Sequence, residues 1–258
     1  MTLEDLGYNN ELASYRKEQG LEAFDVGRVI SEHKERYGVR TPEGTFDAEI
    51  IGNLRYTAQK REDFPAVGDW VAISAYDDDK VLIHHVLPRK TMIARQAVGK
   101  HAELQIIATN IDYAFIVQAV DRDFNINRLE RYITICHTAK VNPIIILNKI
   151  DLIEKSELEE LLQQVSERDK NIPLIALSNE TGEGLEKIKK HIVTGQTYCL
   201  LGSSGVGKSS LLNNLIGEEQ MKTSHISEST QRGRHVTTHR EMTVLESGGI
   251  IIDNPGMR

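Results

Sequence analysis

The spacing of apolar residues changes near residue 100 and divides the chain into two parts. Before that point, short runs alternate between apolar and polar residues and are separated by turn-forming stretches, among them Thr41-Pro42-Glu43-Gly44. Such alternation is typical of half-buried strands. It predicts five strands, at Asp25–Ile30, Gly38–Arg40, Phe46–Ile51, Asp69–Ala75 and Lys80–Leu87. Five short strands in succession predict a small antiparallel barrel.

After residue 101, buried strands alternate with segments whose apolar residues recur at helical spacing. The predicted strands are Ile111–Val120, Pro143–Leu147, Pro173–Leu177, Thr197–Leu201, Glu241–Leu245 and Gly249–Ile252, and the predicted helices are Asn125–Lys140, Ser156–Arg168, Gly184–His191 and Lys208–Ile216. Ser156 and Glu159 have the spacing of a capping box. The alternation predicts an α/β fold with a mostly parallel sheet and helices on both faces.

The change of pattern also predicts how the chain is divided. We expect residues 1–20 to form an N-terminal extension, residues 21–95 a barrel domain and residues 96–258 an α/β domain. The sole tryptophan, Trp70, follows a turn and begins a strand. We interpret Trp70 as a core residue, and the alternative is a ring that stacks on a nucleic-acid base.

The composition indicates a globular protein that stays inside the cell. The chain has 258 residues, 31 Lys and Arg, 38 Asp and Glu, a net charge of −7 and 40% hydrophobic residues, which excludes a mainly disordered chain. Two cysteines are too few for a disulfide framework. The N-terminus is acidic, and no apolar run approaches the roughly 20 residues of a membrane span. We expect a cytoplasmic protein with no membrane partner.

A glycine-rich loop lies between the predicted strand Thr197–Leu201 and the predicted helix Lys208–Ile216. It matches G-x-x-x-x-G-K-[ST] and comprises Gly202, Ser203, Ser204, Gly205, Val206, Gly207, Lys208 and Ser209, with Ser210 next. Such a loop points several N–H groups at a polyphosphate, at the positive end of the following helix. Lys208 is expected to reach the β- and γ-phosphates and assist catalysis, and the Ser209 hydroxyl to bind Mg²⁺. We predict that these residues, Ser210 included, bind phosphate.

A second motif concerns the base. Asn148-Lys149-Ile150-Asp151 follows the predicted strand Pro143–Leu147. The Asp151 carboxylate can accept from N1–H and the 2-amino group of guanine, donors that adenine lacks. Asn148 is expected to support the base edge and the loop, and the aliphatic stem of Lys149 to lie over the ring. Ser178 and Asn179, at another strand end, stand where a backbone N–H can contact guanine O6.

The last motif lies close to the end of the sequence. Asp253-Asn254-Pro255-Gly256 fits D-x-x-G, in which the aspartate orients Mg²⁺ through water and the glycine N–H faces the γ-phosphate. Between this motif and the glycine-rich loop lies the polar segment 233–240. There we select Thr238 as a Mg²⁺ ligand, with Thr237 as the alternative. The basic residues of this segment are either part of the site or a solvated face.

The order of the motifs is permuted. In the usual GTPase the phosphate loop comes first, whereas here Asn148–Asp151 and Ser178 precede it and Asp253–Gly256 comes last. A parallel sheet tolerates new termini when the old ones lie close together. The sequence therefore predicts a circularly permuted P-loop GTPase domain.

The joint set of motifs resembles the RsgA (YjeQ) family of GTPases. The resemblance includes Pro65-Ala66-Val67-Gly68-Asp69-Trp70-Val71, Phe124-Asn125-Ile126-Asn127-Arg128-Leu129 and Gly233-Arg234-His235-Val236-Thr237-Thr238, and it runs from about residue 24 to the last residue. It implies an OB-type barrel that binds ribosomal RNA and GTP hydrolysis stimulated by the small ribosomal subunit. It also implies a checkpoint role late in the maturation of the bacterial subunit, with hydrolysis coupled to release. GTP or GDP and Mg²⁺ are the implied ligands.

The chain departs from the family pattern at several positions. Members of the family continue past D-x-x-G into a zinc-binding domain, whereas this sequence stops at Arg258, so we expect zinc only in that further domain and either a truncated chain or a missing remainder. Val236 stands where threonine is common, and Asn254 where threonine or serine is frequent. Neither position is expected to supply an essential ligand.

Hydrolysis needs a group that orients water. Met257 occupies the position at which many GTPases have a glutamine, and an apolar side chain cannot orient water, so slow intrinsic turnover is expected. The resemblance suggests His235 as the catalytic group, ordered by the ribosome. The alternative is that His235 is an ordinary surface imidazole.

Two other functions are compatible with the motifs. One is a guanine-nucleotide-controlled switch that binds RNA or protein and hydrolyses GTP only incidentally. The other is a P-loop ATPase, in which Asp151 would follow Asn148 and Lys149 by chance. Competition between GDP and ADP separates the ATPase from the GTPase. We expect a monomer.

Overall fold

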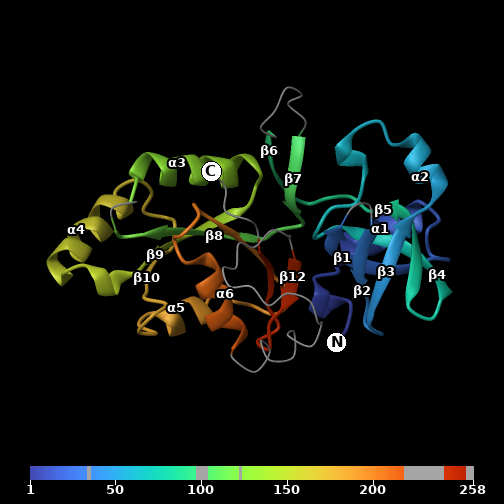
Figure 1. Cartoon of the computed structure of the whole chain (residues 1–258). Coiled ribbons are helices and arrows are strands. Elements are labelled where there is room, and N and C mark those ends of the chain that lie inside the picture. Colours follow the sequence, from blue (N-terminus) through green and yellow to red (C-terminus); the bar gives the residue numbers. More distant parts are fainter. Residues whose placement is uncertain (34–35, 97–103, 122–123, 218–240, 254–258) are drawn as a thin grey trace.

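The structure is a computed structural model of the chain, and it describes residues 1–33, 36–96, 104–121, 124–217 and 241–253. The predictions for His235, Thr237, Thr238 and Gly256 concern positions outside these residues. Figure 1 shows a barrel and an α/β sheet side by side, joined through their strands. No described helix is both long and apolar enough to cross a bilayer.

The barrel contains the five predicted strands. They are β1 (Asp25–His33), β2 (Arg36–Arg40), β3 (Thr45–Ile50), β4 (Trp70–Asp77) and β5 (Lys80–Val86). Their order is β1-β2-β3-β5-β4, and β4 pairs back onto β1, so the barrel is closed. The prediction of an antiparallel barrel needs one correction, because β3 and β5 run parallel. The OB-like barrel predicted from the sequence is confirmed.

Short helices and an N-terminal segment cover the barrel. They are η1 (Glu4–Leu6), α1 (Asn10–Glu18), α2 (Gly52–Thr57) and η2 (Arg61–Asp63). Leu6 and Leu12 pack with Trp70 in one apolar cluster. Trp70 is 1% exposed, which confirms its interpretation as a core residue. The Arg28 guanidinium lies over the Trp70 ring, 5.6 Å from its centroid.

The α/β part is a six-stranded run of the sheet in the order β10-β9-β8-β11-β13-β12. Its strands are β8 (Tyr113–Ala119), β9 (Asn142–Asn148), β10 (Leu174–Ala176), β11 (Thr197–Leu201), β12 (Glu241–Val244) and β13 (Ile250–Asp253). Neighbouring strands are parallel except β12 and β13. This confirms the mostly parallel sheet.

Helices cover both faces of this sheet, as Figure 1 shows. They are α3 (Ile126–Thr138), α4 (Lys155–Ser166), α5 (Leu185–Lys189) and α6 (Lys208–Ile216), with η3 (Ile150–Leu152) after β9. Leu129 of α3 and Val165 of α4 belong to the cluster on one face, whereas Ile188 of α5 and Leu211 of α6 belong to the cluster on the other.

Two local predictions differ from the structure. Helix α4 is capped by a box formed by Glu154 and Glu157, so the predicted pair Ser156 and Glu159 is wrong. Glu154 keeps an extended backbone and its own side chain caps the first turn, which starts the helix earlier. The antiparallel pair β6 (Met92–Gln96) and β7 (Leu104–Thr109) was not predicted, because its alternation is irregular and its register shifts between Ile93 and Ala94.

Candidate nucleotide-binding site

The carboxyl ends of the parallel strands meet at one edge of the sheet, and the sequence motifs lie there. Asn148 ends β9, Asp253 ends β13, the glycine-rich loop follows β11, and Ser178 lies two residues beyond β10. Open α/β sheets bind ligands at this edge. The fold thus brings together motifs that are separated by up to a hundred residues along the chain.

The glycine-rich loop packs closely on its neighbours. Gly202, Gly205 and Gly207 have φ values of 149°, 85° and 97°. A Cβ on Gly202 would lie 2.4 Å from the Val117 carbonyl oxygen, and one on Gly207 would lie 2.2 Å from Nδ2 of Asn148. Neither position can hold a side chain without displacing its neighbours. Gly202 and Gly207 are therefore required by the contact between the loop and the strand ends.

Lys208 begins α6 and is only 8% exposed. Its Nζ donates to the carbonyl oxygens of Gly202, at 3.0 Å, and Ser203, at 2.7 Å. Burial lowers the pKa of Lys208, and the nearby Asp253 carboxylate raises it in opposition. Asp253 is itself 7% exposed. The loop therefore contains a buried ammonium group beside a buried carboxylate, and Ser209 follows on the exposed first turn of α6.

Two asparagines connect the base motif to the phosphate loop. Asn148 is 1% exposed, and its Nδ2 donates to the Val206 carbonyl oxygen at 2.8 Å. Its Oδ1 accepts from the backbone N–H of Asn179 at 3.2 Å. Nδ2 of Asn179 donates to the Gly207 carbonyl oxygen at 2.9 Å. Both side chains therefore fix the position of the loop relative to the ends of β9 and β10.

Asp151 and Ser178 also contact each other. The Ser178 hydroxyl donates to Oδ1 of Asp151 and accepts from the backbone N–H groups of Glu180, at 3.2 Å, and Thr181, at 3.1 Å. Ser178 is fully buried, whereas Asp151 is exposed. The hydroxyl therefore orients a carboxylate that solvent and ligands can reach.

Lys149 has a left-handed backbone, with φ of 67°, and an ion pair that the sequence did not predict. Its Nζ lies 2.8 Å from Oδ2 of Asp121, which follows β8. The side-chain exposures are 33% for Lys149 and 27% for Asp121. The position of Asp121 after a buried strand was the signal that could have identified it.

The described donors fit a magnesium ion. Ser209 offers a hydroxyl and Asp253 a carboxylate, and Mg²⁺ prefers oxygen ligands of this kind. No group of three or more His, Cys, Asp or Glu side chains that could hold a metal occurs in the part of the chain that the structure describes. Among the described residues, Ser209 and Asp253 are therefore one hydroxyl and one carboxylate of the kind that could hold Mg²⁺ beside a phosphate.

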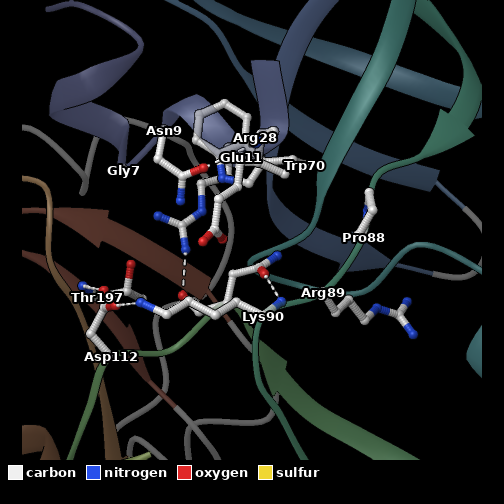
Figure 2. A pocket seen from close by; sticks show the side chains of 12 residues that line it. Gly7, Asn9, Glu11, Arg28, Trp70, Pro88, Arg89, Lys90, Asp112 and Thr197 are labelled. Carbon is white, nitrogen blue, oxygen red and sulfur yellow. Dashed lines mark hydrogen bonds and ion pairs between the residues drawn. The ribbon is translucent and has the colours of Figure 1, made fainter. Parts of the chain in front are cut away.

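A hollow lies at the junction between the barrel and the α/β part, as Figure 2 shows. This cavity of about 180 Å³ is lined by Arg28, Trp70, Lys90, Asp112 and Thr197, among others, and by none of the residues predicted to bind nucleotide or Mg²⁺. Asp112 accepts from Lys90 Nζ at 3.1 Å and from the backbone N–H of Thr197, the first residue of β11, at 2.8 Å. The cavity therefore lies at the amino end of β11, away from the motif-bearing edge at the carboxyl ends of the strands.

Comparisons with known proteins agree with this geometry. The chain matches the family described as RsgA GTPase over residues 86–258. It is 42% identical over 233 residues to Small ribosomal subunit biogenesis GTPase RsgA 2 of Lactiplantibacillus plantarum, covering 90% of this chain and 65% of that protein. It is also 42% identical over 259 residues to the protein of the same name from Listeria monocytogenes, covering 100% of this chain and 71% of the relative.

Two solved structures have the same fold. The crystal structure of YjeQ from Thermotoga maritima superimposes with a TM-score of 0.67 and 24% identity, covering 90% of this chain and 74% of that one. YloQ, described as a circularly permuted GTPase, gives a TM-score of 0.64 and 25% identity, covering 90% of this chain and 71% of that one. The chain spans just under two thirds of the L. plantarum relative.

Proposed function

The chain belongs to the RsgA GTPase family, and from this premise we propose that it hydrolyses GTP to GDP and phosphate during assembly of the small ribosomal subunit. The observation that carries the proposal is the set of hydrogen bonds from Asn148 and Asn179 to the Val206 and Gly207 carbonyls. These bonds support one site for a guanine base and a polyphosphate, because they fix the two motifs relative to each other.

Each motif residue has a proposed role. The Asp151 carboxylate accepts from N1–H and the 2-amino group of guanine, and Ser178 orients it. The stem of Lys149 lies against the base, while Asn148 and Asn179 hold the loop. The loop N–H groups and Lys208 bind the phosphates, and Ser210, also in the first turn of α6, belongs to the same site.

For hydrolysis, the residues position reactants and neutralise charge. Mg²⁺, when bound, neutralises charge on the β- and γ-phosphates. Ser209 and Asp253 would hold it, the latter through water, together with Thr238 or Thr237. The Gly256 N–H faces the γ-phosphate, and His235 orients the attacking water. Met257 cannot take that part, so turnover is slow until the subunit orders the segment that carries His235.

The barrel and the α/β part have different proposed tasks. Residues 21–95 contact the ribosomal RNA of the small subunit, residues 96–258 bind and hydrolyse GTP, and residues 1–20 form an extension. OB-type barrels offer one sheet face and two loops to nucleic acid, which supports this division. We propose a cytoplasmic monomer whose release from the subunit is coupled to hydrolysis.

Two measurements test the proposal. GDP should displace a fluorescent guanine nucleotide at concentrations at which ADP does not, because adenine lacks both donors that Asp151 recognises. Phosphate release should rise when small ribosomal subunits are added. Equal competition by ADP would refute the base assignment, and tight GTP and GDP binding without subunit-dependent turnover would identify a nucleotide-controlled switch instead.

A further inference from the structure

Arg128 of α3 reaches the glycine-rich loop from a neighbouring element. Its Nη1 donates to the Ser203 hydroxyl at 2.9 Å. The carbonyl oxygen of the same serine accepts from Lys208 Nζ at 2.7 Å. Two cationic side chains from different helices therefore meet on one residue of the loop.

The first turn of α3 holds Arg128 firmly in place. The Asn125 side chain accepts from the backbone N–H of Arg128 at 3.0 Å and caps the helix. Gln118 on β8, only 2% exposed, donates to the Asn125 carbonyl at 3.1 Å and accepts from its N–H at 3.3 Å. Leu129 is fully buried beneath the turn. The backbone that carries the guanidinium is thus hydrogen-bonded to the central sheet.

The charge of Arg128 is not balanced by a carboxylate among the residues that the structure describes. Other cations of the structure pair with carboxylates: Lys149 pairs with Asp121, and Arg89 of the barrel part pairs with Asp69 at 2.7 Å. Arg128 instead donates to a neutral hydroxyl. A guanidinium binds phosphate oxygens well because its donors form a planar fork.

We propose that Arg128 is a second cation of the phosphate site, which acts beside Lys208 on the terminal phosphate of GTP. The inference rests on the proposed function. The lysine of this motif reaches the β- and γ-phosphates. Because Ser203 contacts both Lys208 and Arg128, Arg128 lies at that end of the site, and the Ser203 hydroxyl orients it. GDP lacks the terminal phosphate, so Arg128 discriminates between the two nucleotides.

The test compares Arg128→Ala with Arg128→Lys, and uses Arg131→Ala as the matched control because Arg131 is an exposed arginine one turn along α3. Titration calorimetry measures the affinities for GDP and for a non-hydrolysable GTP analogue. We expect Arg128→Ala to weaken the analogue about tenfold and GDP less than about threefold, as loss of one charge-assisted contact predicts. Arg128→Lys should lie between, and Arg131→Ala should bind like the parent.

Further measurements distinguish a direct contact of Arg128 with phosphate from an effect of Arg128 on the conformation of the glycine-rich loop. Ser203→Ala combined with Arg128→Ala should cost less than the sum of the two, since both act through one contact. Equal losses for GDP and the analogue, at an unchanged melting temperature, would overturn the inference, as would unchanged affinity for both. Lys208→Ala is the reference: if it abolishes binding while Arg128→Ala is silent, only this inference fails, and if Lys208→Ala binds normally, the proposed function fails.

Discussion

Arg28 at the barrel junction and Lys208 in the glycine-rich loop are both buried cations that donate to backbone carbonyls, yet their acceptors come from different places. The Arg28 nitrogens donate to Leu6 at 2.6 Å, Gly68 at 3.1 Å and Asn110 at 3.0 Å. These acceptors belong to the N-terminal segment, the barrel and the α/β part. Arg28 therefore joins three distant segments of the chain.

Among the residues that the structure describes, the acceptors of Lys208 are Gly202 and Ser203, which lie in its own loop. Burial lowers the pKa of both cations, that of Arg28 to about 10, and carboxylates oppose the shift in each case. The difference teaches how to distinguish a structural cation from a functional one. A cation whose acceptors lie far apart in sequence stabilises the fold, whereas one whose acceptors lie in a ligand-binding loop can exchange them for a ligand.

The largest expected effect comes from Lys208→Ala. Removing the ammonium should weaken GTP about 1000-fold, about 4 kcal/mol, because charge-assisted contacts to the β- and γ-phosphates are lost. GDP should lose less, because only its β-phosphate contacts Lys208. Stability against urea should change little, because the two lost hydrogen bonds are offset by removal of a charge whose burial costs free energy. Lys187→Ala, which removes an exposed lysine of α5, is the control. A large loss of stability in Lys208→Ala would break the comparison.

Asp151→Asn should act on the site and not on the fold. The amide loses two charge-assisted hydrogen bonds to guanine, so GDP affinity should fall about 100-fold, about 3 kcal/mol. The amide can instead donate to the 2-carbonyl of xanthine, and xanthosine diphosphate should then bind better than GDP. Competition titrations against both nucleotides measure the preference. Unchanged GDP affinity would contradict the assignment of Asp151.

Arg28→Met should act on the fold and not on the nucleotide site. The methionine fills part of the space but leaves the buried Leu6 carbonyl and the half-buried Asn110 carbonyl without a donor, whereas the Gly68 carbonyl keeps the hydrogen bond from Nδ2 of Asn110 at 3.0 Å. This should cost about 2 kcal/mol in the free energy of unfolding. Nucleotide affinity should remain that of the parent. Urea denaturation and GDP titration measure the two quantities, with Arg131→Ala as an exposed-arginine control. A variant of full stability with weakened GDP binding would reverse the roles assigned to the two cations.

The sequence predicted elements best where local signals agreed. Thr197–Leu201 and Lys208–Ile216 match β11 and α6 at both ends, because the glycines between them break both periodicities. The parallel pairing of β3 with β5 has no local signature, since apolar alternation does not specify a partner strand. Capping by Glu154 was missed because glutamate is not among the preferred N-cap residues.

Contacts between distant segments were the hardest to predict. The pattern of apolar and polar residues around Arg28 does not indicate that its side chain is buried. Arg28 is nevertheless 1% exposed, because the carbonyls that accept from it come from residues 6, 68 and 110. The base and phosphate motifs were recognisable because each is contiguous. Asp121 and Arg128 act on those motifs from elsewhere in the chain. The position of Asp121 after a buried strand was a signal for it, but its pairing with Lys149 and the contact of Arg128 with Ser203 follow only from the folded arrangement.

The smallest expected effect is that of Asp121→Asn. The ion pair with Lys149 is partly exposed, and such pairs contribute less than about 1 kcal/mol, so GDP affinity should fall about two- to threefold. The reason is that Lys149 would lose the contact that holds its stem at the base site. The control is Asp78→Asn, in the exposed turn between β4 and β5. A double-mutant cycle with Lys149→Met isolates the pair, and a coupling energy of zero would show that Asp121 does not act through Lys149.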